Sequence, residues 1–441
     1  MAKAFISFLG TSDYLKCRYT LNKKPGSVVK YVQEDIAQRF CRQWTEKDEI
    51  RIFTTRAAIE KNWNDNGHTD RNTKQTIMDA GLEKRLNEIN TKAVIRKIDI
   101  PEGNNEQEIW EIFEIVYNTL EEDDEIIFDI THSFRSIPML FMVLIGYARL
   151  LKKISVAGIY YGAFEVLGGY NQVKEMHEEK REAPIFDLTS FEQLIEWTEA
   201  AQNFIKNGIA DDFARLAREK INPVLKDSHG KDQAASDMRN IIINIEKISR
   251  NIFVNRGADI INFNYDHIKK PLQSLQENDI FIKPMKPLMA VIEKKIDTFA
   301  QNDIENGFRA VEWSVEHGLY QQAVTMLQEN TFTMILAREN MEWGLEKNRH
   351  AISKAFKIKA LKMENPDFTD DEERQLVARL LKNPVVIECH GLFERLTRLR
   401  NDLNHGGYLT EKNKKAKSSE SIRDQFQTIY SAIKDVLKWD D

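Results

Sequence analysis

Two residues that could cut RNA, Arg400 and His405, stand five positions apart near the C-terminus, with Asn401 and Asn404 between them. Histidine exchanges a proton near neutral pH. Arginine holds a phosphate through a rigid fork of donors. These residue types could cleave RNA without a metal if a ribose 2′-hydroxyl attacks the neighbouring phosphate. The same spacing is common on helices, where it usually marks only a polar pair at a helix end.

The residues around this pair predict a helix with two different faces. At about 100° per residue, Arg400 and His405 lie within an arc of about 140° on a polar face. Gly406 fits a C-terminal cap. His405 is then expected in the last turn, where the helix dipole favours its protonated form. The opposite face is predicted to be buried through a stripe of leucines: Leu392, Leu396, Leu399 and Leu403.

Two polar loops in the N-terminal half form a second candidate site. Ligands of parallel α/β sheets bind beyond the carboxyl ends of strands, where the strand order reverses. Hydroxyls, backbone N–H groups, a helix N-terminus and an arginine together favour an anion. Helix capping is the alternative role for the hydroxyl residues, and a local hydrogen bond is the alternative for the histidine. The candidates are Gly10, Thr11 and Ser12 in the first loop and Thr131, His132, Ser133 and Arg135 in the second.

Strand-like and helix-like segments alternate through the first half of the chain, which predicts a mainly parallel sheet covered on both faces. The second half reads as helices alone. The expected fold is α/β plus all-α, with a Rossmann-like domain over 1–187, a helical connecting region over 188–300 and a helical domain over 301–441. The patterns predict strands over 4–9, 49–54, 93–100, 125–130, 154–161 and 173–176, and helices over 28–40, 74–89, 106–120 and 133–151.

Composition limits the partners and the compartment. The formal net charge is −6, so any nucleic-acid site must be a local patch rather than a property of the whole surface. The three cysteines, at 17, 41 and 389, are too far apart in the sequence to indicate a zinc site or a disulfide framework. The longest apolar run, 137–151, is too short to span a bilayer. These features predict a cytoplasmic protein with no metal and no membrane contact.

Four segments, in this order, resemble one family. Residues 8–14 resemble the opening of the CRISPR-associated CARF proteins, and Asp129–His132 resembles their Asp-x-Thr-His signature. Residues 319–323 and the Arg400…His405 pair resemble the HEPN ribonuclease domain of the same family. The resemblance implies an ancillary ribonuclease of a type III CRISPR system. Such a protein is a homodimer, needs no cofactor, and is activated by a cyclic oligoadenylate, most often the tetra-adenylate.

The resemblance also implies roles for individual residues. The two N-terminal loops would bind the ring, although the family usually has glycine where Ser12 and Ser133 stand. His405 would move a proton and Arg400 would stabilise the phosphate, with Asn401 and Asn404 orienting them. The expected reaction is metal-independent cleavage of single-stranded RNA to a 2′,3′-cyclic phosphate, in a site shared by two protomers.

Two alternatives stay open at this stage. A ligand-sensing transcription regulator would use the same sensor, but residues 211–304 contain no convincing DNA-recognition helix. A toxin with the HEPN fold would modify RNA instead of cutting it.

Overall fold

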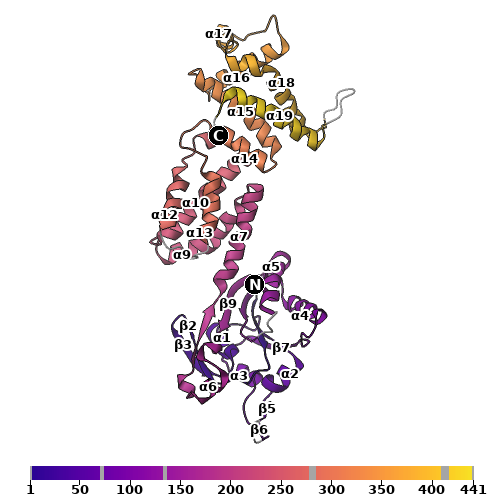
Figure 1. Ribbon diagram of the computed structural model, residues 1–441, viewed down its shortest axis with the longest axis vertical. Coiled ribbons are helices and arrows are strands. Elements are labelled where there is room, and N and C mark those ends of the chain that lie inside the picture. The colour runs from indigo at the N-terminus through magenta and orange to yellow at the C-terminus, as the bar shows by residue number, and fades with distance from the viewer. Residues whose placement is uncertain (1, 70–73, 133–136, 278–284, 409–416, 440–441) are drawn as a thin grey trace. The chain divides into compact units, whose positions relative to one another are not determined.

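The computed structural model describes residues 2–69, 74–132, 137–277, 285–408 and 417–439. These residues fall into two compact units, Met1–Gln193 and Leu194–Asp441. The first is built on a sheet and the second is helical (Figure 1).

The N-terminal unit contains a mixed sheet with a parallel centre. Its strand order is β3-β2-β10-β9-β8-β1-β4-β7. The strands from β9 to β7 in this order run parallel, β10 is antiparallel to β9, and β2 and β3 form an antiparallel hairpin at one edge. The prediction of a mainly parallel sheet is confirmed. The strands are β1 (Lys3–Leu9), β2 (Cys17–Leu21), β3 (Lys24–Val29), β4 (Glu49–Thr54), β7 (Val94–Asp99), β8 (Glu125–Asp129), β9 (Ser155–Gly162) and β10 (Glu182–Asp187), with a separate pair β5 (His68–Thr69) and β6 (Thr76–Ile77).

Helices cover both faces of this sheet. Successive side chains of a strand point to opposite faces, so Phe5 enters one core and Ile6 enters the other. Helices α1 (Val32–Phe40) and α3 (Leu82–Asn87) pack on the Phe5 side. Helices α4 (Glu106–Thr119) and α5 (Ile137–Lys152) lie side by side on the Ile6 side (Figure 1). Short segments complete the unit: α2 (Arg56–Ala58), α6 (Tyr170–Glu175), and the single turns η1 (Ile59–Trp63), η2 (Phe164–Leu167) and η3 (Glu178–Lys180).

The order of the strands reverses beside β1. The chain adds β4 and β7 on one side of β1, then returns to place β8 and β9 on the other side. Strands β1 and β8 are parallel neighbours, with Ser7 opposite Asp129. Their carboxyl ends therefore bring together the two polar loops, at the position where such sheets bind ligands.

Three local predictions differ from the structure. Residues 74–89 do not form one helix, because Thr76–Ile77 pairs with His68–Thr69 and α3 begins only after Gly81. The helix expected over 28–40 begins at Val32, after the edge strand β3. Residues 173–176 were expected to form a strand after a turn, but α6 occupies most of them. Its first turn is closed by the side chain of Gln172, which accepts a hydrogen bond from the backbone N–H of Gly169 at 3.3 Å.

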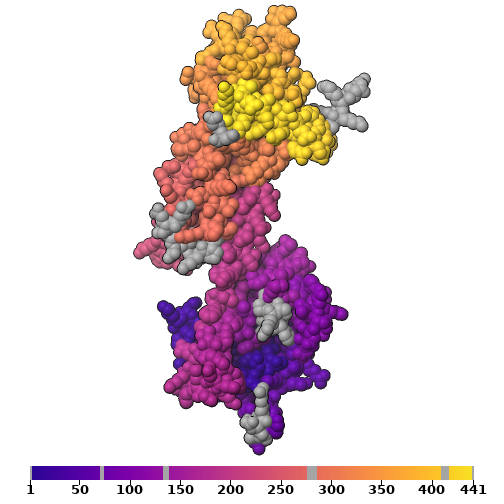
Figure 2. Space-filling view, in the orientation of Figure 1, coloured from indigo at the N-terminus to yellow at the C-terminus, as the bar shows by residue number. Residues whose placement is uncertain are grey.

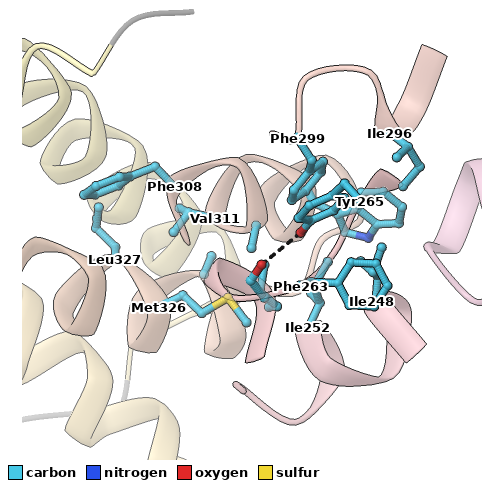
Figure 3. Packing of buried hydrophobic residues seen from close by; sticks show 14 of the residues in the cluster. Ile248, Ile252, Phe263, Tyr265, Ile296, Phe299, Phe308, Val311, Met326 and Leu327 are labelled. Carbon is cyan, nitrogen blue, oxygen red and sulfur yellow. Dashed lines mark hydrogen bonds between the residues drawn. The ribbon is translucent and has the colours of Figure 1, made fainter. Parts of the chain in front are cut away.

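The C-terminal unit is helical in all of its described segments. Its core surrounds residues such as Tyr265, whose hydroxyl donates to the carbonyl of Ile260 at 3.1 Å (Figure 3). None of the described helices is long and apolar enough to cross a bilayer. The elements are α7 (Thr189–Asn207), α8 (Asp211–Leu216), η4 (Ala217–Ile221), α9 (Asn222–Asp227), α10 (Gln233–Phe253), α11 (Gly257–Ile261), α12 (Asp266–Glu277), α13 (Met285–Ile296), α14 (Asn306–Glu316), α15 (Tyr320–Arg338), α16 (Glu346–Leu361), α17 (Asp371–Leu380), α18 (Pro384–Asn404) and α19 (Ser419–Leu437).

Helix α18 carries the Arg400…His405 pair and packs against α15, α16 and α19. In Figure 2, α19 forms much of the viewed surface of the C-terminal unit, in yellow. The predicted leucine stripe is confirmed: Leu396 and Leu399 are fully buried, and Leu392 and Leu403 pack against the same core. The burial of this stripe fixes which face of α18 remains available for chemistry.

Candidate functional sites

A pocket of about 320 Å³ opens at the switch point of the sheet. Ser12, Thr131 and His132 line it, so the fold brings together residues of both predicted loops. Gly10 and Thr11, also predicted, are not among the lining residues. The predicted residues Ser133 and Arg135 lie outside the described part of the chain. Most of the remaining wall carries no sequence motif that predicts it, and it includes Tyr14, Tyr19, Lys30, Phe164, Glu165 and Tyr170.

The buried carboxyl of Asp129 anchors the second loop. It accepts hydrogen bonds from the Ser7 hydroxyl at 2.7 Å, the Thr131 backbone N–H at 3.0 Å and the Thr131 hydroxyl at 2.5 Å. Burial raises the pKa of Asp129 to about 6, against the lowering effect of these hydrogen bonds. The Thr131 oxygen also accepts from the Gly162 N–H at 2.8 Å. The hydroxyl of Thr131 therefore makes hydrogen bonds that hold the loop in place, rather than pointing freely toward a ligand.

Asn62 fixes the first loop from the other side. Its amide nitrogen donates to the carbonyls of Gly10 at 2.9 Å and of Ser12 at 3.1 Å. A Cβ atom on Gly10 would lie 2.7 Å from the Tyr14 hydroxyl. Glycine at this position lets Tyr14 fold back over the loop. The need for glycine arises from this close approach and is visible only in the tertiary structure.

His132 is a neutral, partly enclosed ring at the pocket wall. Its centroid lies 4.3 Å from that of Tyr14. Its Nε2 atom is shielded from solvent and has no hydrogen-bond partner among the described residues. Burial lowers the pKa of His132 to about 3. The imidazole can thus exchange hydrogen bonds with a ligand or stack on it, but it does not supply positive charge at neutral pH.

The described wall combines aromatic rings with a few charges. The Lys30 ammonium lies 2.8 Å from Asp79, and Asp13 lies 2.6 Å from the Lys61 ammonium and 3.3 Å from His68. These ion pairs hold the wall in a fixed geometry. Such a lining suits a ligand with flat rings and a polar edge.

The second candidate site lies at the C-terminal end of α18. His405 is the residue at which the helix ends, and Gly406 takes the left-handed conformation with φ of 58°. The N–H groups of Gly406 and Gly407 donate to the carbonyls of Leu403 and Asp402 at 3.0 and 3.1 Å, which closes the last turn. The predicted glycine cap is confirmed. It leaves the His405 side chain exposed, with no hydrogen bond or ion pair to any described residue.

Glu329 of α15 links Arg400 to a second arginine. The Arg400 guanidinium lies 3.8 Å from one oxygen of Glu329, and the Arg349 guanidinium lies 2.5 Å from the other. One turn further along α18, the amide of Asn404 accepts from Gln321 at 3.3 Å, whereas Asn401 is exposed. The fold thus holds Arg400 and Asn404 against α15 and leaves Asn401 and His405 open to solvent.

Comparisons with known proteins place the N-terminal unit in a family. Residues 4–165 match the model described as CRISPR system endoribonuclease Csx1, CARF domain. CRISPR-associated protein MJ1674 of Methanocaldococcus jannaschii is 25% identical over 276 residues, which is 62% of this chain and 39% of that relative. The chain thus spans less than half the length of the relative. The N-terminal unit is a CARF domain of the CRISPR-associated kind, and a large helical unit follows it.

Proposed function

With a CRISPR-associated CARF domain as the premise, we propose that this chain is a ribonuclease activated by a cyclic oligoadenylate. The ring binds at the switch-point pocket, and the end of α18 cleaves single-stranded RNA. The observation that carries the proposal is the pocket itself, because it lies at the carboxyl ends of β1 and β8 and most of its lining falls within the matched residues 4–165.

The pocket suits one part of a cyclic tetra-adenylate. Tyr14 and Tyr170 offer rings on which adenines stack. Lys30 is the cation of the described lining, although it is paired with Asp79, and Arg135 of the predicted second loop would add positive charge for phosphates. A volume of about 320 Å³ is at the low end for a drug-sized ligand, so one pocket holds only a part of the ring. A second copy of the chain supplies the rest, since a two-fold axis presents each loop twice to a near-symmetric ring.

An exposed apolar face on α5 supports the homodimer. Met139 and Leu150 are 77% and 78% exposed, and Val143 and Tyr147 lie between them on the same helix. Trp110 of the neighbouring α4 is also exposed. Contiguous apolar surface of this kind marks an interaction site. Helix α5 follows the loop after β8, so pairing through this face brings the two copies of that loop toward one ring.

The chemistry at α18 needs no metal. A ribose 2′-hydroxyl attacks the adjacent phosphorus, a 2′,3′-cyclic phosphate forms, and the 5′-oxygen leaves with a proton. His405 moves a proton to or from these oxygens. Arg400 stabilises the negative charge that develops on the phosphate, and Glu329 holds its guanidinium. The exposure of His405 is consistent with a site completed by the same helix end of the partner.

The test is cleavage of single-stranded RNA with and without cyclic tetra-adenylate, in the presence of a metal chelator. We expect cleavage only with the ring, and fragments that end in a 2′,3′-cyclic phosphate. Equal cleavage in both reactions would rule out gating. Added nucleotides on intact RNA, detected by mass, would indicate a modifying toxin. Specific binding of duplex DNA in a shift assay would favour a transcription regulator.

A further inference from the structure

A second pocket, also of about 320 Å³, lies beside Arg400 in the C-terminal unit. Helices α15, α16 and α18 form its walls. None of the proposed catalytic steps uses it. Its lining residues are Gln328, Phe332, Ser353, Phe356, Lys357, Ala360, Leu361, Phe393, Glu394, Thr397, Arg398 and Arg400.

The floor of this pocket is aromatic. Phe332, Phe356 and Phe393 come from the three helices and pack on one another, with ring centroids 4.0 to 5.9 Å apart. All three are buried. Their packing gives a rigid, apolar base, while the rim carries hydroxyl, amide and cationic groups. This combination is typical of a pocket for a small flat ligand with a polar edge.

Two buried polar atoms at this pocket lack partners. Gln328 is only 5% exposed, yet its Oε1 accepts no hydrogen bond from the described residues. The Nε atom of Arg400 is likewise enclosed and unpaired within the described structure. Buried polar groups are almost always hydrogen-bonded, so an acceptor and a donor left open at one pocket point to a ligand that satisfies them.

The pocket and the proposed catalytic end share one face of α18. Phe393, Thr397, Arg400 and Asn404 follow one another at spacings of four, three and four residues, which places them in one row along the helix. His405 lies five positions beyond Arg400, a rise of about 7.5 Å along a helix. A nucleotide whose phosphate contacts Arg400 can therefore place its base in the pocket while His405 reaches the sugar–phosphate backbone.

We infer that this pocket binds one nucleobase of the RNA, next to the phosphate that is cleaved, and that Gln328 reads its edge. The inference rests on the proposed function and names its substrate subsite. Proteins recognise single-stranded RNA by taking up unstacked bases and hydrogen-bonding their edges. The glutamine amide has one donor face and one acceptor, so it discriminates between bases that present different edges.

The test is binding, measured without cleavage. The probes are fluorescent 2′-O-methyl hexanucleotides of each base, which lack the attacking hydroxyl, and an abasic hexamer of equal charge. Fluorescence anisotropy with the full-length protein, in the absence of the ring, gives each affinity. We expect the preferred base to bind about tenfold more tightly than the abasic chain. Gln328→Leu should remove that tenfold advantage and leave binding of the abasic hexamer unchanged.

A second pair of variants keeps the test independent of the buried glutamine. Ser353 is exposed at the rim, so Ser353→Trp should close the pocket and lower base-dependent binding, whereas Ser353→Ala should not. Gln375→Leu changes an exposed glutamine of α17 and serves as the matched control. The inference is overturned if the abasic hexamer binds as tightly as the others, or if Gln328→Leu and Ser353→Trp both leave the base preference unchanged.

This readout separates the inference from the proposed function. If the wild-type protein prefers a base in binding but never cleaves RNA with the ring, the pocket assignment stands and the ribonuclease proposal fails. If it cleaves RNA under control of the ring but shows no base-dependent binding, the ribonuclease proposal stands and the pocket assignment fails.

Discussion

The two sites of this protein are built in opposite ways. The switch-point pocket is assembled from strand ends and loops that are far apart in the sequence, and its polar groups are tied down by Asp129, Asn62 and ion pairs. The proposed catalytic residues come from one turn at the end of a single helix, and His405 projects into solvent. The switch-point pocket is preorganised within one chain. At the end of α18, the side where His405 lies is open to solvent.

The contrast between a preorganised pocket and an exposed helix end suggests different requirements for ligand binding and for catalysis. A pocket that many segments hold in place can bind its part of a ligand without rearranging, because its geometry is fixed before binding. A site on one exposed helix end needs another surface to enclose the substrate and exclude water. A change in how two copies pair would strongly alter the site at the end of α18. It would alter the switch-point pocket only at its rim. Such an arrangement suits a protein in which ligand binding controls catalysis.

The largest effect is expected from His405→Ala. Loss of a general acid or base lowers the rate by about 10²- to 10⁴-fold, so ring-stimulated cleavage should nearly disappear. Calorimetric titration should show unchanged affinity for cyclic tetra-adenylate, because the two sites are separate. His390→Ala, on the same helix, is the control and should cleave normally. Cleavage by His405→Ala at the wild-type rate would remove this residue from the mechanism.

A smaller but still large effect is expected from Val143→Glu on α5. Val143 is 61% exposed on the apolar face, so a carboxylate there leaves the fold intact but penalises burial against a second copy. Sedimentation should show a shift toward monomer, and ring-stimulated cleavage should fall by more than about tenfold if the site is shared. Val254→Glu, also at a valine with 61% exposure, is the control. A Val143→Glu protein that is dimeric and fully active would place the interface elsewhere.

The pH dependence of stability should report on His132. Its folded pKa of about 3 lies below the usual value of 6.5, so below pH 6.5 the unfolded state binds a proton that the folded state does not. Above pH 6.5 the neutral His132 does not lower the free energy of unfolding. Below pH 6.5 the free energy of unfolding falls with the pH, by about 2 kcal/mol at pH 5. His132→Phe should remove that loss in thermal or urea unfolding.

Comparing His132→Phe with the wild-type protein separates the effect of His132 from that of Asp129. Asp129, with a raised pKa of about 6, favours the folded state as the pH falls from 6 toward 4, which is the opposite trend. Both proteins keep Asp129, so its contribution cancels in the difference. If the stability difference between His132→Phe and wild type is the same at pH 5 and pH 7, the ring of His132 is not kept neutral by the fold.

The smallest effect is expected from Glu329→Gln. Its ion pair with Arg400 spans 3.8 Å at a partly exposed position, and such pairs contribute up to about 1 kcal/mol. The turnover rate should fall about two- to fivefold with little change in KM, because Arg400 loses alignment rather than contact with RNA. Glu346→Gln, at an exposed carboxylate of α16, is the control. A change in KM alone would assign Glu329 to RNA binding.

The elements with strong periodicity could be predicted from the sequence alone. Continuous apolar strands and alternating helices predicted the parallel sheet, and the leucine stripe with Gly406 predicted both faces and the end of α18. These features depend on neighbours within a few residues, so the local pattern contains the information. The paired loops after β1 and β8 were also predictable, because parallel strands carry their ligands at their carboxyl ends.

The side chains that complete each site depend on long-range packing and could not be predicted from local patterns. Lys30, Tyr170 and Glu165 reach the first pocket from segments with no motif of their own. Strands β2, β3 and β10 and helix α6 were missed or misassigned because elements of five or six residues carry weak periodicity. Gln328 and Glu329 appeared in the sequence as ordinary helix residues. Their positions beside Arg400 arise from the packing of α15 against α18, a long-range contact that no local pattern encodes.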